Sequence, residues 1–350
     1  MDEMTQLNLL RAEVPRPALA DLRAEENRLL SEMVAPGSAR LPRPARPGRA
    51  WPLRIGLGAV ATGLAAAAVA GIVVTGGGSG DPKASYTPMA VPVAVVQTLD
   101  RAADAATRQR ELHPRPGQFL VVESQADETS DLSNAKGHFR YLACSRRKIW
   151  LPVEGRATGG VLTETVLPPK PYGKWPIPPE AEKEVGTSGP ARAADFDNRA
   201  EYLRNDYAYL SRLPADPQGM RAHLYDHLKP GTLEGDREAW SRVGAMLTEA
   251  YMPAAQRAAL FRAAATVPGA QAVGRAEDAA GRQGIAIART DEDAGERTEY
   301  IFDPKTYLFL GRRAVVTDAE KGQAPVGTVT ESTAQLKVTV ADSAPKVTGG

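Results

Sequence analysis

The longest apolar run of the chain covers residues 55–75, where twenty-one successive residues carry no charge. A helix needs about 20 apolar residues to cross the hydrocarbon core of a bilayer. Five arginines precede the run within fifteen residues, and a Gly/Ser stretch at 76–80 follows it: Arg40, Arg43, Arg46, Arg49 and Arg54. Because excess arginine holds its side of a span in the cytoplasm, the pattern predicts a single-pass membrane protein with its N-terminus inside and its C-terminal part outside.

Two other interpretations of this run are a buried core helix and a cleaved signal peptide. The arginine-rich flank disfavours a core helix. Residues 68–70 (Ala-Val-Ala) resemble a cleavage site, but a secretory signal normally occupies the first 15–30 residues. The apolar run also continues beyond that site to Val74. We therefore expect an uncleaved anchor.

The anchor divides the chain into four parts: a cytoplasmic tail at 1–54, the span at 55–75, a flexible stalk at 76–90 and an extracytoplasmic domain at 91–350. In the tail, apolar residues recur at helical spacing, which predicts short amphipathic helices before a Pro/Arg spacer: Leu19, Leu22, Leu29 and Met33. Two interpretations of the tail stay open. It docks to a cytoplasmic partner, or it is a weakly ordered segment with nascent helicity.

Helical and alternating patterns follow one another beyond residue 90 in the order helix, strands, helices, strands. This order lacks a regular β-α-β alternation, so it predicts an α+β domain with a curved antiparallel sheet packed by helices. We expect helices at 91–109, 196–213, 215–228, 237–252 and 253–267, strands at 118–124, 137–145, 148–152, 159–166, 284–288, 298–302, 307–311 and 335–340, and a long proline-rich loop at 167–193. In the first of these helices Val95, Leu99, Ala102 and Ala106 share one face, and Asp216 is a natural N-cap for the helix at 215–228. Turns are expected at Asp278–Gly281, between two strands, and at Asp303–Pro304.

Candidate metal and nucleophile sites are few. His223 and His227 would lie on one face of a helix, as zinc ligands can, but two histidines are too few and solvent-facing side chains are the simpler interpretation. Cys144, the single cysteine, precedes the basic run 146–148, which would favour a thiolate. No positioned base is evident, so a half-buried strand residue is favoured, with the basic run as a solvated strand end.

The remaining chemistry is equally sparse. The acidic stretch 290–297 lacks the spacing of a calcium loop. The net charge of +1 gives no general attraction to nucleic acid. We expect no enzyme activity, no cofactor and no metal.

Five motifs carry a resemblance to a known family: "HPRPGQFLVVES", "RRKIWLP", "LPADPQGMRAHLY", "VPGAQAVGRAEDAAGRQGIAI" and "FDPKTYLFLG". With them the chain resembles a family of actinobacterial single-pass membrane proteins of unknown function, often encoded beside extracytoplasmic-function sigma factors. The resemblance implies no catalytic residue. In element order, the exported part is also similar to the half-barrel of lipoprotein carriers and of periplasmic regulators that bind anti-sigma factors, which is an analogy of fold.

Two functions follow as expectations. The first is a membrane-anchored, non-catalytic sensory or regulatory protein, tied to sigma-factor signalling. The second is an exported protein that binds lipid or a cell-wall fragment in an apolar pocket between sheet and helices. The aromatic residues expected near such a pocket are Phe119, Phe139, Tyr141, Trp150, Trp240 and Phe261.

Overall fold

The computed structural model describes residues 89–155, 159–193 and 204–347. The predicted tail and span, and nearly all of the stalk, lie outside these ranges, as do Leu19, Leu22, Leu29 and Met33. Within the described ranges, no helix combines the length and apolar character that a membrane crossing requires.

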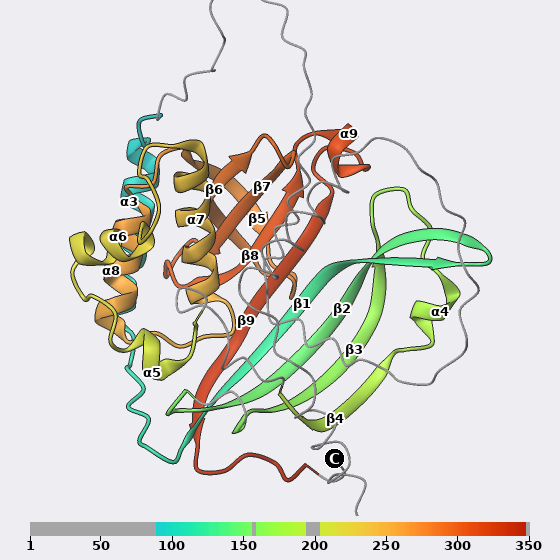
Figure 1. Cartoon of the computed structure of the whole chain (residues 1–350), viewed down its shortest axis with the longest axis horizontal. Coiled ribbons are helices and arrows are strands. Elements are labelled where there is room, and N and C mark those ends of the chain that lie inside the picture. The colour runs from blue at the N-terminus through green and yellow to red at the C-terminus, as the bar shows by residue number, and fades with distance from the viewer. Residues whose placement is uncertain (1–88, 156–158, 194–203, 348–350) are drawn as a thin grey trace, which may run out of the picture. The chain divides into compact units, whose positions relative to one another are not determined.

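Nine strands in the described part of the chain form one antiparallel sheet, in the order β4-β3-β2-β1-β9-β8-β7-β6-β5 (Figure 1). The strands are β1 Phe119–Asn134, β2 Gly137–Pro152, β3 Val161–Pro171, β4 Gly186–Arg192, β5 Ala270–Glu277, β6 Gln283–Asp291, β7 Glu296–Phe302, β8 Phe309–Val316 and β9 Val329–Ala341. The last strand in the chain, β9, thus joins the β1–β4 half to the β5–β8 half. The expected α+β class with a curved antiparallel sheet is confirmed.

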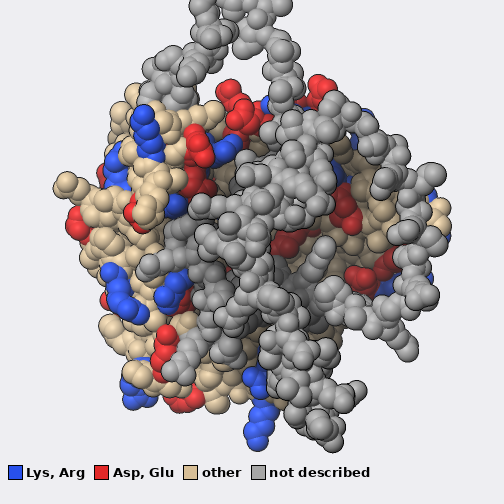
Figure 2. Space-filling model, in the orientation of Figure 1, with Lys and Arg blue, Asp and Glu red and all other residues tan. Residues whose placement is uncertain are grey.

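The longer helices gather on the β5–β8 half of the sheet, whereas β1–β4 extend away from them (Figure 1). They are α3 Val93–Arg108, α6 Pro217–Leu224, α7 Leu233–Leu247 and α8 Ala254–Ala264, and the short helices are α4 Pro179–Glu182, α5 Tyr207–Leu210 and α9 Ala319–Gly322. On the face drawn in Figure 2, basic and acidic side chains of the described residues are interspersed, in keeping with the near-neutral net charge.

Apolar residues of the helices and of β6 and β7 make one large core. The ring centroids of Phe261 and Phe302 lie 5.5 Å apart, and those of Trp240 and Tyr300 lie 4.7 Å apart. The predicted stripe of α3 is buried in this core, which confirms the face assigned from its spacing: Val95, Leu99, Ala102 and Ala106. Burial of such side chains at about 25 cal/mol per Å² is the main force that holds the helices on the sheet.

The first hairpin is longer than the sequence pattern indicates. β1 and β2 have sixteen residues each and pair along their whole length. The two short strands predicted at 137–145 and 148–152 are one strand. The side chains of the basic run at their junction point alternately to the two faces of the sheet, as in any strand. Arg146 and Lys148 are exposed, and Arg147 is buried. The basic run is therefore not a solvated strand end.

The prediction of a continuous loop at 167–193 is wrong, since this range contains the end of β3, α4 and β4. The proline-rich end of β3 pairs only with β2, because β4 pairs with residues 161–166 of β3. Proline lacks an N–H donor and is tolerated on such a one-sided stretch.

Several helix bounds also differ from expectation. The helix predicted at 196–213 includes α5, which begins after the N-cap Asp206, while residues 196–203 lie outside the described ranges. Asp216 caps α6 through the Gly219 N–H, as predicted. α7 begins four residues earlier than predicted, because Thr232 accepts a hydrogen bond from the Gly235 N–H. The predicted turn at Asp278–Gly281 is confirmed, with the Gly281 N–H donating to the Asp278 carbonyl.

Candidate ligand-binding site

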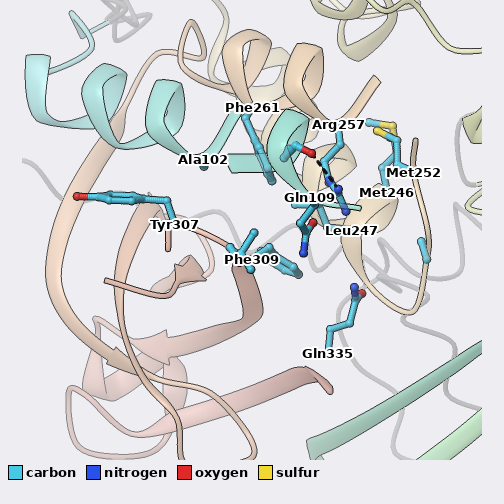
Figure 3. A pocket seen from close by; sticks show the side chains of 13 residues that line it. Ala102, Gln109, Met246, Leu247, Met252, Arg257, Phe261, Tyr307, Phe309 and Gln335 are labelled. Carbon is cyan, nitrogen blue, oxygen red and sulfur yellow. Dashed lines mark hydrogen bonds between the residues drawn. The ribbon is translucent and has the colours of Figure 1, made fainter. Parts of the chain in front are cut away.

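A small cavity lies between α3, α8, the connection from α7 to α8, and strands β8 and β9 (Figure 3). We call it the inner cavity. Its volume is about 50 Å³. Most of its lining is aliphatic or aromatic: Ala102, Ala106, Met246, Leu247, Ala250, Met252, Phe261, Leu308 and Phe309. The elements that surround it come from the beginning, the middle and the end of the domain sequence.

Three polar side chains interrupt this apolar lining. They are Gln109, Arg257 and Gln335 (Figure 3). Arg257 donates a hydrogen bond from Nη2 to the Ala106 carbonyl at 3.5 Å. Within the described part of the chain, however, Arg257 Nε and Gln335 Oε1 have no hydrogen-bond partner although both atoms are buried. An unsatisfied buried donor or acceptor costs about 1–3 kcal/mol, so a guest that accepts from Arg257 and donates to Gln335 would be stabilised here.

Burial also acts on the charge of Arg257. It lowers the pKa of the guanidinium, and Tyr251 and Glu111 act in the opposite direction. A guanidinium remains protonated at neutral pH because its ordinary pKa lies above 12. The inner cavity therefore holds a permanent, partly desolvated positive charge beside apolar walls.

A wider depression of about 520 Å³ adjoins the inner cavity and shares Gln109, Tyr307 and Leu308 with it. We call it the outer groove. Three basic side chains and one acidic side chain line it: Arg101, Arg108, Lys305 and Asp104. Asp104 is paired with Arg262 at 2.8 Å. The outer groove is thus net positive and attracts anions.

The turn between β7 and β8 forms one wall of the outer groove. Asp303 Oδ1 accepts hydrogen bonds from the N–H groups of Lys305 and Thr306, which is how aspartate stabilises a tight turn. The turn places Tyr307, whose φ is 59°, against α3. There Arg101 Nη1 donates to Tyr307 Oη at 2.6 Å, and the guanidinium also lies over the Tyr307 ring. The predicted Asp303–Pro304 turn thereby shapes the groove.

A second polar cluster lies where β1 and β2 meet the α7–α8 connection. Arg147 of β2 lies 3.3 Å from Glu128 Oε1 and 3.3 Å from Glu249 Oε1. Ser124 of β1 donates to the same Glu249 oxygen at 2.5 Å, and Arg312 and Glu331 form a further pair close by. Burial raises the pKa of Glu128, which Arg147 lowers and which the neighbouring carboxylates of Glu331, Glu249 and Glu164 raise further. The cluster ties β1, β2, β8, β9 and the α7–α8 connection together.

The structure does not bring the six predicted ligand-binding aromatics together. Phe261 lines the inner cavity. Trp240 is 3% exposed and packs on Tyr300 in the core. Phe119 and Trp150 lie near one end of the β1–β2 hairpin, and Phe139 and Tyr141 lie near the other. Ligand contact by these residues stays a prediction. They lie too far apart in the fold to line one shared pocket.

Arg257, Gln335 and the two methionines of the inner cavity were not foreseen. A signal existed for Arg257, because it precedes Phe261 by four residues and so shares a helix face with it. Gln335 carries no comparable signal, since its position opposite α8 depends on the pairing of the last strand.

The zinc interpretation of His223 and His227 fails on geometry. α6 ends at Leu224, and His227 lies beyond it with φ 60°, so the two imidazoles do not share a helix face. His223 Nε2 lies 3.2 Å from Tyr209 Oη, while the His227 side chain is 88% exposed. In the described ranges, no group of three or more His, Cys, Asp and Glu residues is placed to hold a metal ion.

The reactive-thiolate interpretation of Cys144 is also wrong. The residue is 2% exposed on β2. Burial, with help from the nearby Asp127, raises the pKa of its thiol to about 12. Cys144 is a buried strand residue, and its thiol is protonated at neutral pH.

Neither a protein-family model nor a curated protein sequence matches the chain. Among solved structures, a similar one is the putative outer membrane lipoprotein-sorting protein domain from Vibrio parahaemolyticus. The two share 10% sequence identity with a TM-score of 0.20, over 70% of this chain and 93% of the other. At this TM-score the similarity carries no argument about function.

Proposed function

We propose that this chain is a single-pass membrane protein whose extracytoplasmic domain binds an amphiphilic anion, without catalysis, in the inner cavity and the outer groove. One observation carries the proposal. Arg257 Nε is a buried donor of a cationic group without a partner among the described residues, at an apolar cavity, and that cavity adjoins a groove lined by three basic side chains.

The sizes of the two spaces define the binding mode. Sites for small ligands usually have volumes of about 300–1,000 Å³. The outer groove lies within this range, and the inner cavity is far smaller. An anionic headgroup would therefore cross the groove, where Arg101, Arg108 and Lys305 attract it, and pair with Arg257 at the inner cavity. Its apolar chain would enter the cavity by displacing the walls. Lipid carriage of the lipoprotein-carrier type is a narrower version of the same proposal.

Photo-crosslinking of the full chain in membranes tests this function. The probe is a twelve-carbon fatty acid with a diazirine on its chain, compared with the corresponding fatty alcohol. We expect the acid to label peptides of α8 and of the α7–α8 connection, since a desolvated ion pair with Arg257 contributes about 1 kcal/mol or more, which is roughly fivefold in affinity. Arg257→Met should reduce labelling by about that factor, because it keeps an apolar stem and removes the charge.

Arg212→Met is the matched control, because Arg212, like Arg257, donates to a backbone carbonyl, that of Ala208, but lines neither the cavity nor the groove. It should leave labelling at α8 unchanged. Equal labelling by acid and alcohol, or full labelling of Arg257→Met, would contradict an anion site at Arg257.

The tail supports a second, regulatory part of the proposal. Its amphipathic stripe and the predicted topology place an apolar surface in the cytoplasm, and we propose that it contacts a sigma factor through Leu19, Leu22, Leu29 and Met33. Affinity capture with the full chain should recover a sigma factor, and replacing the four residues by serine should abolish the recovery. Capture that is identical with and without the four replacements would exclude this contact.

A further inference from the structure

The connection between α7 and α8 contains a buried glutamate in an uncommon backbone conformation. Glu249 is 4% exposed, and its φ is 49°. A residue other than glycine in this region costs about 1–3 kcal/mol and persists only where the surroundings hold it in place. Contacts of the Glu249 side chain must therefore stabilise this conformation.

The carboxylate of Glu249 is bound by two residues of the sheet. Ser124 Oγ donates to Glu249 Oε1 at 2.5 Å, and Arg147 Nε lies 3.3 Å from the same oxygen. Ser124 and Arg147 are direct cross-strand partners of β1 and β2. One side chain from the helical layer is thus bound to both strands of the first hairpin. We call the set Glu249, Ser124 and Arg147 the latch.

The residues around Glu249 in sequence belong to the inner cavity. Leu247, Ala250 and Met252 all line it. The Glu249 carboxylate therefore contacts the sheet, while residues on either side of Glu249 form the cavity wall. A guest larger than about 50 Å³ that displaces this wall has to move the backbone of Glu249 as well.

We propose that the latch transmits occupation of the inner cavity to the β1–β2 hairpin, a role that rests on the proposed binding function. In the empty state the wall is in place and the latch is closed. In the occupied state the segment 247–252 shifts, the contacts to Ser124 and Arg147 lengthen, and the strained φ of Glu249 relaxes. The guest shifts the balance between these states by its difference in affinity for them.

A cavity-filling variant tests the latch without any ligand. Ala250→Leu places three extra carbon atoms in the inner cavity and so stands in for a guest. Hydrogen exchange is measured on the full chain in lipid nanodiscs. We expect residues 122–126 of β1 to exchange about tenfold faster than in the wild type, with residues 300–302 of β7 as the internal reference, because a local opening changes one region and leaves the other unchanged.

The combination of Ala250→Leu with Glu249→Gln tests whether the leucine acts on β1 through Glu249. Glu249→Gln weakens the tie to Arg147, so β1 should already exchange faster, and the added leucine should change its rate by less than twofold. Glu238→Gln is the matched control, since Glu238 pairs with Arg242 on α7 itself. In that background the leucine should keep its full effect. Ala250→Val offers a smaller filling group if the leucine prevents folding.

Two results would overturn the latch. One is an equal acceleration of β1 and β7 in Ala250→Leu, which reports general destabilisation. The other is an undiminished leucine effect in the Glu249→Gln background. Because no ligand is used, either result rejects the latch and leaves the binding proposal to the crosslinking experiment.

Discussion

Glu299→Ala is expected to lower the free energy of unfolding of the α+β domain by about 3–5 kcal/mol, because it removes one partner from a buried ion cluster. Glu299 is fully buried on β7. Its carboxylate accepts from Arg297 Nη2 at 2.6 Å and from Arg313 Nε at 2.7 Å. Without the carboxylate, two guanidinium groups face each other in a partly desolvated site.

Thermal unfolding of the full chain in detergent micelles measures this effect. For a domain of this size, a loss of about 3–5 kcal/mol corresponds to a decrease in Tm of roughly 6–20 °C. The control is Glu123→Ala, which breaks the half-exposed pair of Glu123 with Lys148 and should cost less than about 1 kcal/mol. Similar losses for the two variants would show that the Glu299 cluster is no more stabilising than a surface pair.

The predicted membrane topology should decide which introduced thiols are labelled in intact cells. A membrane-impermeant maleimide applied to intact cells should label Ser79→Cys in the stalk, because the stalk is predicted to lie outside. It should not label Ser38→Cys in the tail until the cells are lysed. The opposite pattern would show an inverted orientation, and a mature chain that starts near Gly71 would show that the apolar run is a cleaved signal.

Cys144 is the internal reference for that experiment. With a pKa of about 12, about one thiol in 10⁵ is ionised at pH 7, against about one in 10² for an ordinary cysteine, and the thiolate is the reactive form. We therefore expect Cys144 to be labelled at least about 1,000-fold more slowly than the thiol introduced by Ser79→Cys in the same chain, until denaturant exposes it. Rapid labelling of Cys144 in the folded protein would contradict its burial on β2.

Local patterns predicted much of the helical layer. The buried face of α3 follows from apolar residues at helical spacing, and the start of α6 follows from Asp216 and Pro217, which act within one turn. Strand lengths were harder to predict from the sequence. The charged residues of β1 and β2 look like the end of a strand in sequence, yet the pairing continues through them, because Lys148 pairs with Glu123 on the opposite strand and Arg147 pairs with Glu249 of the α7–α8 connection.

The sequence by itself determined the coarse order of helix, strands, helices and strands, and with it the α+β class, because these patterns depend on residues within a few turns of one another. The anchor and its arginine bias stay predictions from the sequence. Only the tertiary structure decided the candidate site. Ser124 meets Glu249 across 125 residues, and Gln335 reaches the inner cavity because β9 inserts between β1 and β8. Such contacts depend on the register and curvature of the whole sheet, which no local pattern specifies.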